Sequence, residues 1–280
     1  MKYLIIINPE SGIKKSLNIF HNIVEPLLIQ EKIKFDYLIT KTSQHAENFL
    51  IDYDDIDRII VLGGDGTMHE VINGIMKNSK IENVPIGLLP TGSGNSLIHD
   101  IGSLNIKKNF LNILDNKERA IDIIEIKSNN KIYYSMNLVG WGMGTDIGIL
   151  SERLRWVGPI RYNLASIVKI FTYKPKYAKL IIDNNIIYEK FLLIIICNTK
   201  HIGRGMKMAP KAKLNDGLVD IITIKNNLNK FELLKLFPKI FNGDHIKNEK
   251  VNYFQGSKIE LITNNKEILN IDGELKAKTP

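Results

Sequence analysis

The sequence predicts an α/β protein built in two parts: a parallel α/β domain over residues 1–120 and a β-rich, sandwich-like domain over residues 121–280. Two observations support this prediction. In the first part, continuous apolar runs alternate with amphipathic segments, as in a parallel sheet whose strands are joined by crossover helices. In the second part, strand-like runs follow one another and are separated by short turns, which is typical of antiparallel pairing.

The first part contains four predicted strands, and the run YLIIIN near the start of the chain is typical of them. Continuous apolar runs are expected of parallel strands that are covered on both faces. The predicted strands cover residues 3–8, 34–40, 58–64 and 84–90, and the predicted helices cover residues 15–30, 45–53 and 68–76. Ligands of such sheets gather at the carboxyl ends of the strands, so the loops after these strands are the candidate site.

The second part contains predicted strands over residues 121–128, 131–139, 178–198, 218–225 and 257–263. The longest of these runs is divided by Asp183-Asn184-Asn185, which is a turn sequence. Helices are predicted at residues 161–171 and 230–241. Together these elements indicate an antiparallel sheet or sandwich with a few added helices.

Charge and cysteine content narrow the classes of partner and compartment. The formal charge of +8 favours anionic partners: a nucleotide, an acidic membrane or nucleic acid. Cys197 is the only cysteine, so a disulfide within the chain is impossible and a reducing compartment is expected. No apolar run approaches the ~20 residues of a spanning helix, and the N-terminal run is shorter than a secretory signal requires. We therefore expect a cytoplasmic protein that associates peripherally with membranes, and the sequence leaves its oligomeric state open.

Three loops that follow predicted strands could hold phosphate. The loop NPESG (8–12) offers backbone amides beside Ser11, although taken alone an ordinary strand-to-helix turn explains it better. The loop GGDGT (63–67) leaves room for phosphates at its glycines and leads into a helix N-terminus. Asp65 would take a proton, help to hold magnesium, or simply cap the helix. The loop PTGSGNSL (90–97) follows the neighbouring strand, and neither glycine loop has P-loop or GxGxxG spacing.

The runs GGDGTMHEVINGIM (63–76) and LLPTGSGNSL (88–97) resemble the diacylglycerol-kinase catalytic family, and within it the sphingosine- and ceramide-kinase-like branch. The resemblance extends in the family's order to residues 141–162, 208–221 and 271–274 and covers essentially the whole chain. It implies a nucleotide-binding α/β domain, a β-rich lipid-substrate domain, and an active site in the cleft between them, to which the segment near 270–280 returns. The implied activity is transfer of the γ-phosphoryl group of Mg-ATP to a hydroxyl of a membrane lipid, which would be a sphingoid base, ceramide or diacylglycerol.

The resemblance also implies roles for residues of the first part. Asp65 is the implied general base that activates the lipid hydroxyl. Glu70 lies on the first turn of the following helix, where it would face either the nucleotide or solvent. The remaining residues of the implied ATP site are Asn8, Pro9, Thr40, Gly63, Gly64, Gly66, Thr67, Gly92, Ser93, Gly94 and Asn95.

In the second part the resemblance adds five residues to the nucleotide site. Ser151, Arg155 and Arg161 match positions where arginines meet the nucleotide phosphates, a role that suits an always-charged bidentate group. Without the resemblance, solvation on a helix surface would explain both arginines. Asp272 and Glu274 match the segment implied to reach the nucleotide and its Mg²⁺ network, and a plain hairpin turn is the alternative.

One position departs from the pattern of sphingosine kinases. Those enzymes carry an acidic residue two positions after Asp146, where it reads the amino alcohol of the substrate, and this chain has Gly148 there. The departure weakens the prediction of a long-chain-base substrate and leaves ceramide, diacylglycerol or another neutral lipid alcohol open. Asp146 would substitute only if the backbone absorbed a displacement of two residues.

Two other classes of function remain as alternatives. An NAD kinase shares the GGDGT turn and would phosphorylate a soluble dinucleotide, but the loop at 90–97 and the run SERLRWVGPIR at 151–161 argue against it. A catalytically silent nucleotide or lipid sensor would keep the fold, but the presence of Asp65, both glycine loops and IDGE argues against that. Nucleic-acid binding rests on basic charge alone, without a recognisable reading motif, and is not expected.

Overall fold

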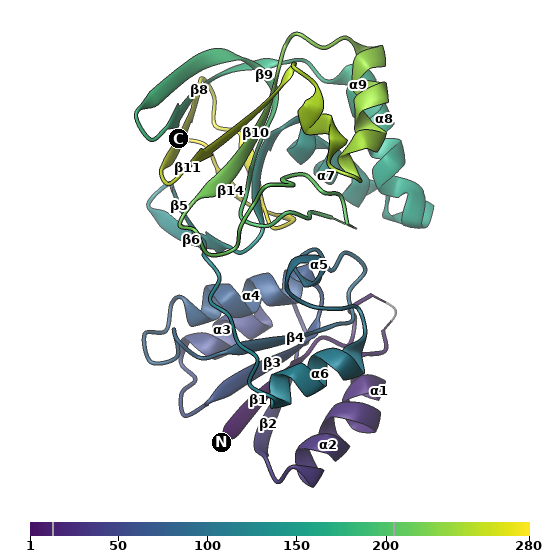
Figure 1. Cartoon of the computed structure of the whole chain (residues 1–280), viewed down its shortest axis with the longest axis vertical. Coiled ribbons are helices and arrows are strands. Elements are labelled where there is room, and N and C mark those ends of the chain that lie inside the picture. Colours follow the sequence, from purple (N-terminus) through teal and green to yellow (C-terminus); the bar gives the residue numbers. More distant parts are fainter. Residues whose placement is uncertain (13, 204) are drawn as a thin grey trace. The chain divides into compact units, whose positions relative to one another are not determined.

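The computed structural model describes residues 1–12, 14–203 and 205–280 (Figure 1). The chain divides into two compact units. Unit 1 comprises Met1–Ile121 together with Gly203–Gly205, and unit 2 comprises Asp122–Ile202 together with Met206–Pro280. Each unit has its own hydrophobic core, and each is described by itself below.

Unit 1 contains a parallel sheet with the strand order β2-β1-β3-β4. The strands are β1 (Lys2–Ile7), β2 (Lys34–Ile39), β3 (Arg58–Gly63) and β4 (Ile86–Pro90). The two central strands, β1 and β3, are almost completely buried, which explains their uninterrupted apolar sequences. β2 lies at an edge and is largely exposed, so its sequence mixes polar and apolar residues.

Helices cover both faces of this sheet. They are α1 (Ser16–Ile19), the π-helical turn η1 (Phe20–Val24), α2 (Glu25–Gln30), α3 (His45–Ile51), α4 (Asp65–Ile75), α5 (Ile98–Ile101) and α6 (Ile106–Leu114). Figure 1 shows α3 and α4 on one side of the strands, and α1, α2 and α6 on the other. On the second side, Phe20, Leu28 and Phe110 pack against Ile5 and Ile60 to form the core.

Unit 2 is built on an antiparallel sheet in which β11, β10, β9, β7, β13 and β14 are neighbours in that order, while β8 pairs with both β9 and β12. β5 and β6 form a separate hairpin. The strands are β5 (Ile124–Ser128), β6 (Lys131–Ser135), β7 (Leu138–Gly142), β8 (Lys176–Ile182), β9 (Asn185–Cys197), β10 (Val219–Lys225), β11 (Val251–Gly256), β12 (Ile259–Thr263), β13 (Ile268–Ile271) and β14 (Glu274–Lys278). The predicted fold class, parallel α/β followed by antiparallel β, is confirmed.

Helices α7, α8 and α9 gather along one side of the unit 2 strands in Figure 1. The helical elements of unit 2 are α7 (Met143–Arg153), η2 (Arg155–Ile160), α8 (Arg161–Thr172), α9 (Lys230–Leu236), η3 (Phe237–Ile240) and η4 (Asp244–Lys247). Successive side chains of β9 point to opposite faces of the sheet, so neighbouring residues of this strand belong to two different cores. Leu193 and Ile195 belong to the cluster that includes α7, α8 and α9, whereas Ile194 and Ile196 belong to a second cluster without those helices.

The helix predicted from Met68 and the strand predicted over residues 131–139 are among the predicted elements that differ from the structure. The helix predicted from Met68 begins at Asp65, because the chain enters the helix directly from Gly64. The run 131–139, predicted as one strand, forms β6 and β7 with a break at Met136 and Asn137. The amides of both break residues donate to the carboxylate of Asp272, which holds the chain out of the sheet at that point.

In the part of the chain that the structure describes, no helix combines the length and the apolar content needed to span a bilayer.

Candidate active site at the carboxyl edge of the parallel sheet

The loops after β1, β3 and β4 contact one another at the carboxyl edge of the sheet in unit 1. The Asn8 side-chain amide donates to the Thr67 hydroxyl at 2.8 Å, which ties the first loop to the start of α4. The Thr91 amide donates to the Gly63 carbonyl at 3.0 Å, and the buried Ser16 hydroxyl donates to the Thr91 hydroxyl at 2.8 Å. Loops that are separate in the sequence therefore form one hydrogen-bonded structure, as the parallel topology predicts.

The glycines of these loops are required by the contacts between the loops. A Cβ atom on Gly92 would lie 2.4 Å from the Cα of Gly64, and a Cβ on Gly12 would lie 2.1 Å from the Thr91 carbonyl oxygen. Gly12 also has φ +54°, which lies in the left-handed region that favours glycine. Side chains at these positions would separate the three loops, so the glycines set the shape of the edge before any ligand is considered.

Asp65 is the first residue of α4 and is held in place by the loop after β4. Its Oδ2 accepts from the Ser96 amide at 2.9 Å, and its Oδ1 accepts weakly from the Leu97 amide at 3.4 Å. Gly94 makes room for the carboxylate, because a Cβ there would lie 2.8 Å from Oδ2. The side chain is half-buried, so it remains accessible while its orientation is restricted.

The edge has features that fit the polyphosphate of a nucleotide. The N-cap of α4 is Gly64, which has no side chain to bond the first amides of this eleven-residue helix. Such amides bind phosphate readily, and the helix dipole favours the anion. Among the described residues, the buried Oδ1 of Asn95 has no hydrogen-bond partner, although its amide group donates to the Gly92 carbonyl at 2.7 Å. This orphaned acceptor marks a place for a donor from a ligand or water.

The donor set also fits a magnesium ion that arrives with a nucleotide. No group of three His, Cys, Asp or Glu side chains that could hold a metal occurs in the described parts of the chain. Mg²⁺ is usually held by one or two carboxylates together with substrate phosphates and water, so a dedicated cage is not required. At this edge the carboxylate available for that purpose is Asp65.

Two residues predicted to bind the nucleotide make hydrogen bonds within the chain, and their role at the nucleotide stays a prediction. Both Glu70 carboxylate oxygens accept from the amides that begin α3, at 2.8 Å from Gln44 and 3.2 Å from Ala46. Thr40 is buried, and its amide and hydroxyl both donate to the Ile7 carbonyl. These contacts fix α3 and the end of β2 at the edge. Of the remaining predicted residues, Pro9 and Gly94 are half-buried, whereas Gly66 and Ser93 are exposed.

Comparison with known proteins identifies the protein family to which the chain belongs. The family model described as the diacylglycerol kinase catalytic domain matches residues 2–126. The family model described as the YegS C-terminal NAD kinase beta sandwich-like domain matches residues 137–280. The chain belongs to the diacylglycerol kinase-like family of lipid kinases. The family predicted from the sequence motifs is therefore confirmed.

Individual relatives of this lipid kinase family align over nearly the whole chain. Sphingosine kinase 1 of Arabidopsis thaliana is 24% identical over 335 residues, which cover 99% of this chain and 69% of that protein. Diacylglycerol kinase of Bacillus subtilis (strain 168) is 27% identical over 290 residues, which cover 99% of this chain and 90% of that protein. A crystal structure of a diacylglycerol kinase from Bacillus anthracis str. Sterne matches with a TM-score of 0.76 at 23% identity, covering 100% of this chain and 92% of that one. This structural likeness supports the fold.

In unit 2, the position that departs from sphingosine kinases lies on α7. A Cβ atom at Gly148 would lie 3.4 Å from the side-chain amide nitrogen of Asn270 in β13. Asp146, one half-turn earlier, pairs with Lys169 of α8 at 3.0 Å. The carboxylate on this stretch of helix is therefore already neutralised by a lysine of the chain.

The other family-implied residues of α7 and α8 contact neighbouring residues. The Ser151 hydroxyl donates to the Gly148 carbonyl at 2.9 Å, within the helix. Arg161 is the first residue of α8 and lies 3.3 Å from a carboxylate oxygen of Glu152. Arg155 belongs to η2, and its side chain lies outside the described part of the structure. Their predicted role at the phosphates stays a prediction.

Asp272 organises the chain around the break between β6 and β7. Its Oδ1 accepts from the Ser135 hydroxyl at 2.7 Å and from the Asn137 and Leu138 amides at 3.0 and 2.9 Å, and its Oδ2 accepts from the Met136 amide at 3.1 Å. The turn Asp272-Gly273 joins β13 to β14, which is the hairpin given above as the alternative. Glu274 is half-buried at the start of β14. Participation of the two acidic residues in a Mg²⁺ network stays a prediction.

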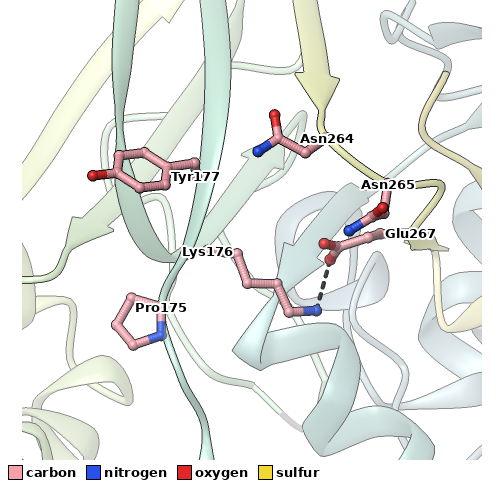
Figure 2. A pocket seen from close by; sticks show the side chains of 6 residues that line it. All are labelled: Pro175, Lys176, Tyr177, Asn264, Asn265 and Glu267. Atoms are coloured by element: carbon pink, nitrogen blue, oxygen red, sulfur yellow. Dashed lines mark hydrogen bonds and ion pairs between the residues drawn. The ribbon is translucent and has the colours of Figure 1, made fainter.

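A hollow of about 480 Å³ lies beside β8 in unit 2 (Figure 2). Its lining includes Tyr177 and Asn265, and Figure 2 shows the ion pair between Lys176 and Glu267, 2.8 Å apart, extending along it. The two opposite charges satisfy each other, and none of the residues implied by the family belongs to this hollow.

Several contributors to the edge and to α7 were missed in the sequence. Ser96 orients Asp65 through its backbone amide, and a backbone donor leaves no signal in residue type. Ser16 supplies a buried hydroxyl to Thr91, and Lys169 neutralises Asp146 across two helices. Both contacts join residues more than twenty positions apart, which no local spacing rule detects. The run PTGSGNSL was the one signal that contained Ser96.

Proposed function

We propose that the chain is an ATP-dependent lipid kinase that transfers the γ-phosphoryl group of Mg-ATP to a hydroxyl of a membrane lipid. The observation that carries the proposal is the position of Asp65 at the N-terminus of α4, oriented by the Ser96 amide. A carboxylate that is oriented but half-exposed suits a general base, which must be both aligned and reachable.

The chain's own residues would bind, orient and accept a proton. The first amides of α4 would bind phosphate oxygens, and the orphaned Asn95 Oδ1 would accept a hydrogen bond from the nucleotide or its water. Asp65 would accept the proton of the attacking lipid hydroxyl. Mg²⁺ bound to the triphosphate would supply charge neutralisation at the transferred group. Positioning and electrostatics therefore do most of the work, as is general for phosphoryl transfer.

The first experiment incubates the purified chain with labelled Mg-ATP and mixed micelles that contain sphingosine, ceramide, diacylglycerol or monoacylglycerol. We expect one lipid to become labelled, and Asp65→Asn to lower the rate by ~10² or more, because general base catalysis contributes at least that factor. An unchanged unfolding temperature would show that the variant still folds. No labelled lipid, followed by labelling of NAD in a lipid-free assay, would replace this proposal with a dinucleotide kinase.

We further propose that the acceptor is a neutral lipid alcohol such as diacylglycerol. Sphingosine kinases have an acidic residue that reads the substrate's ammonium group, and the matching position in this chain is Gly148, which has no side chain. The nearby Asp146 carboxylate is paired with Lys169. A cationic sphingoid base would therefore lose its hydration without gaining a carboxylate partner on this part of α7, which is unfavourable.

The variant Gly148→Asp tests the choice of lipid, with Gly148→Asn as a matched neutral control. The new side chain would lie beside the Asn270 amide, which can donate to a carboxylate. We expect the aspartate variant to gain activity toward sphingosine relative to diacylglycerol by about tenfold, the worth of one charge-assisted hydrogen bond. A native chain that prefers sphingosine over diacylglycerol would contradict the proposal of a neutral acceptor.

We also propose that the protein is cytoplasmic and binds membranes peripherally through α8. Leu164, Ile167, Val168 and Phe171 are exposed and occur at the spacing i, i+3, i+4, i+7, so they form one apolar stripe on the solvent face of the helix. Trp156, just before α8, is 82% exposed. A contiguous exposed apolar face of this kind is typical of surfaces that meet a membrane or another protein.

A further inference from the structure

The positive charge of the chain is distributed unevenly between its two parts. Residues 1–121 contain 13 Lys and Arg against 15 Asp and Glu, whereas residues 122–280 contain 25 Lys and Arg against 15 Asp and Glu. The first segment is therefore slightly acidic, and the second carries the whole positive excess. A charge asymmetry of this kind directs anionic partners to one part of a protein, which here is unit 2.

The helical segment formed by α9 and η3 presents two lysines and an aromatic ring to solvent. Its inner face packs into the apolar cluster that also contains residues of α7 and α8. On its outer face Phe231 is 72% exposed, and Lys235 and Lys239 follow it at intervals of four residues and are also exposed. Residues at this spacing share one side of a helix, so the ring and the two ammonium groups face solvent together.

The acidic residues next to this outer face are already paired with other lysines. Glu232 lies 2.7 Å from Lys250, and Asp244 lies 2.5 Å from Lys247. A hydrogen bond from the lysine lowers the pKa of each carboxyl group below its ordinary value. Among the residues that the structure describes, the two lysines of the outer face form no ion pair, so their charges are available to a partner.

The outer face begins where the apolar stripe of α8 ends. Helices α8 and α9 contact each other and lie side by side in Figure 1. The Lys230 ammonium group donates to the Phe171 carbonyl at 2.7 Å and lies 5.7 Å from the centre of the Phe171 ring. Phe171 is the last residue of the α8 stripe, so the first turn of α9 extends the same exposed surface.

We infer that α9 and η3 bind the surface of an anionic bilayer, with Phe231 at the boundary of the acyl chains and Lys235 and Lys239 at the lipid phosphates. The inference rests on the proposed membrane contact through α8 and adds the class of lipid and the residues that select it. Apolar and aromatic side chains bordered by lysines are the usual composition of helices that lie in a bilayer interface. The long lysine stems keep the ammonium groups at the level of the head groups.

Two other occupants fit this surface less well. A second copy of the chain would bring two positively charged faces together, and like charges repel. A single-stranded nucleic acid would neutralise the lysines but would leave the aliphatic stripe of α8 uncovered. An anionic bilayer satisfies the lysines and covers the apolar side chains at once.

The charge contribution is tested by sedimentation of the purified chain, without nucleotide, with vesicles of phosphatidylcholine or of an equimolar mixture with phosphatidylglycerol. We expect tighter binding to the mixed vesicles. Lys235→Gln with Lys239→Gln should weaken that binding by about thirtyfold, the combined contribution of two lysines near an anionic surface, and should leave binding to phosphatidylcholine unchanged. Lys107→Gln with Lys108→Gln, at exposed positions of α6, removes the same charge from unit 1 and is the matched control.

The apolar contribution is tested with Phe231→Ala, which should weaken binding to both kinds of vesicle by about tenfold through lost apolar burial. Tyr188→Ala is the control, since Tyr188 is 60% exposed but lies on β9. Equal loss in the two lysine pairs, equal binding of the parent to both kinds of vesicle, or no binding to either would overturn the proposal. If labelled oligothymidylate binds the parent and loses affinity in the α9 pair alone, the surface belongs to nucleic acid instead.

The outcome can be separated from those of the other proposals. The vesicles contain neither ATP nor a lipid to be phosphorylated, so a failure of the kinase proposal does not change the result. If Ile167→Glu has no effect on vesicle binding while the α9 lysine pair lowers it, the contact through α8 is wrong and the anionic contact through α9 stands. If neither variant loses binding, both contacts are wrong.

Discussion

Gly64 and Gly92 determine the geometry of the candidate active site at the scale of single residues. Their Cα atoms lie so close that neither position accepts a side chain without a shift of backbone. The sequence alone suggested that these glycines leave room for phosphate, whereas the structure shows that they first leave room for each other. The loops after β3 and β4 must stay in contact for Asp65 to be oriented, because the Ser96 amide of the second loop donates to its carboxylate.

We predict that Gly92→Ala lowers both stability and activity. The new Cβ would meet backbone at 2.4 Å, and overpacking of this kind costs about 1–3 kcal/mol. Because the loop after β4 also orients Asp65, the turnover number should fall further than the loss of stability explains. Gly144→Ala is the control, since its Cβ would have an ordinary contact at 3.7 Å within α7. Unfolding in urea and lipid-kinase rates measure both effects, and a fully active, stable Gly92→Ala would show that the loops tolerate separation.

We predict that Asp272→Ala destabilises unit 2. The carboxylate accepts four hydrogen bonds from residues 135–138, and removal leaves these donors without their acceptor. Bonds to a charged group contribute about 1.5–3 kcal/mol each, so a loss of at least about 3 kcal/mol in the free energy of unfolding is expected. Tryptophan emission follows this unfolding, since both tryptophans lie in unit 2. An unchanged midpoint combined with weaker ATP binding would instead assign the carboxylate to the nucleotide site, and Glu274→Ala serves as the neighbouring control.

At the scale of elements, the sequence predicts β1 and β3 well because burial on both faces makes them uninterrupted apolar runs. The start of α4 is missed because Gly64 and Gly66 give no helical periodicity, although Asp65 is helical. The division between β6 and β7 is missed for a different reason. It depends on Asp272, more than 130 residues away, and a contact at that separation leaves no local pattern.

The sequence also predicts part of the candidate site. Motifs identify Asp65 and the two glycine loops because their residue types are unusual at strand ends. The motifs also predict Glu70 as a nucleotide ligand, which stays a prediction, and they cannot show that its carboxylate accepts hydrogen bonds from the first amides of α3. The chemistry of such a residue depends on which backbone amides it meets, and only the fold determines those neighbours.

The apolar stripe on α8 gives a prediction at the element scale. Replacing Ile167 with Glu should weaken binding to lipid vesicles by more than about tenfold, because burial of one large aliphatic side chain contributes about 1.5–3 kcal/mol. Ile262→Glu is the matched control, since Ile262 is similarly exposed but lies on β12. Sedimentation with anionic vesicles measures the difference, and the same assay in higher salt separates the contribution of the +8 charge. Equal loss in both variants would exclude α8 as the specific contact.

At the scale of the whole molecule, each unit has its own core, so a buried titratable group affects the packing of the unit that contains it. His245 in η4 is a buried titratable group of unit 2. It is 1% exposed, its Nε2 lies 3.0 Å from the Met208 carbonyl, and among the described residues its Nδ1 has no partner. Burial lowers the pKa of His245 below the ordinary value of 6.5, because the charged imidazolium is poorly solvated there.

The lowered pKa predicts that unit 2 loses stability as the pH falls. Below pH 6.5 the unfolded chain binds a proton at His245 that the folded chain resists, so the free energy of unfolding decreases as the pH drops through and below that value. The contribution of one such group is at most about 1.4 kcal/mol per pH unit. Urea unfolding followed by tryptophan emission between pH 7.5 and 5.5 measures it. His245→Gln keeps a donor for the Met208 carbonyl and should flatten the pH dependence, whereas His21→Gln, at an exposed position of unit 1, should leave it unchanged. If the native protein and His245→Gln have parallel pH profiles, His245 is not the group that makes unit 2 sensitive to acid.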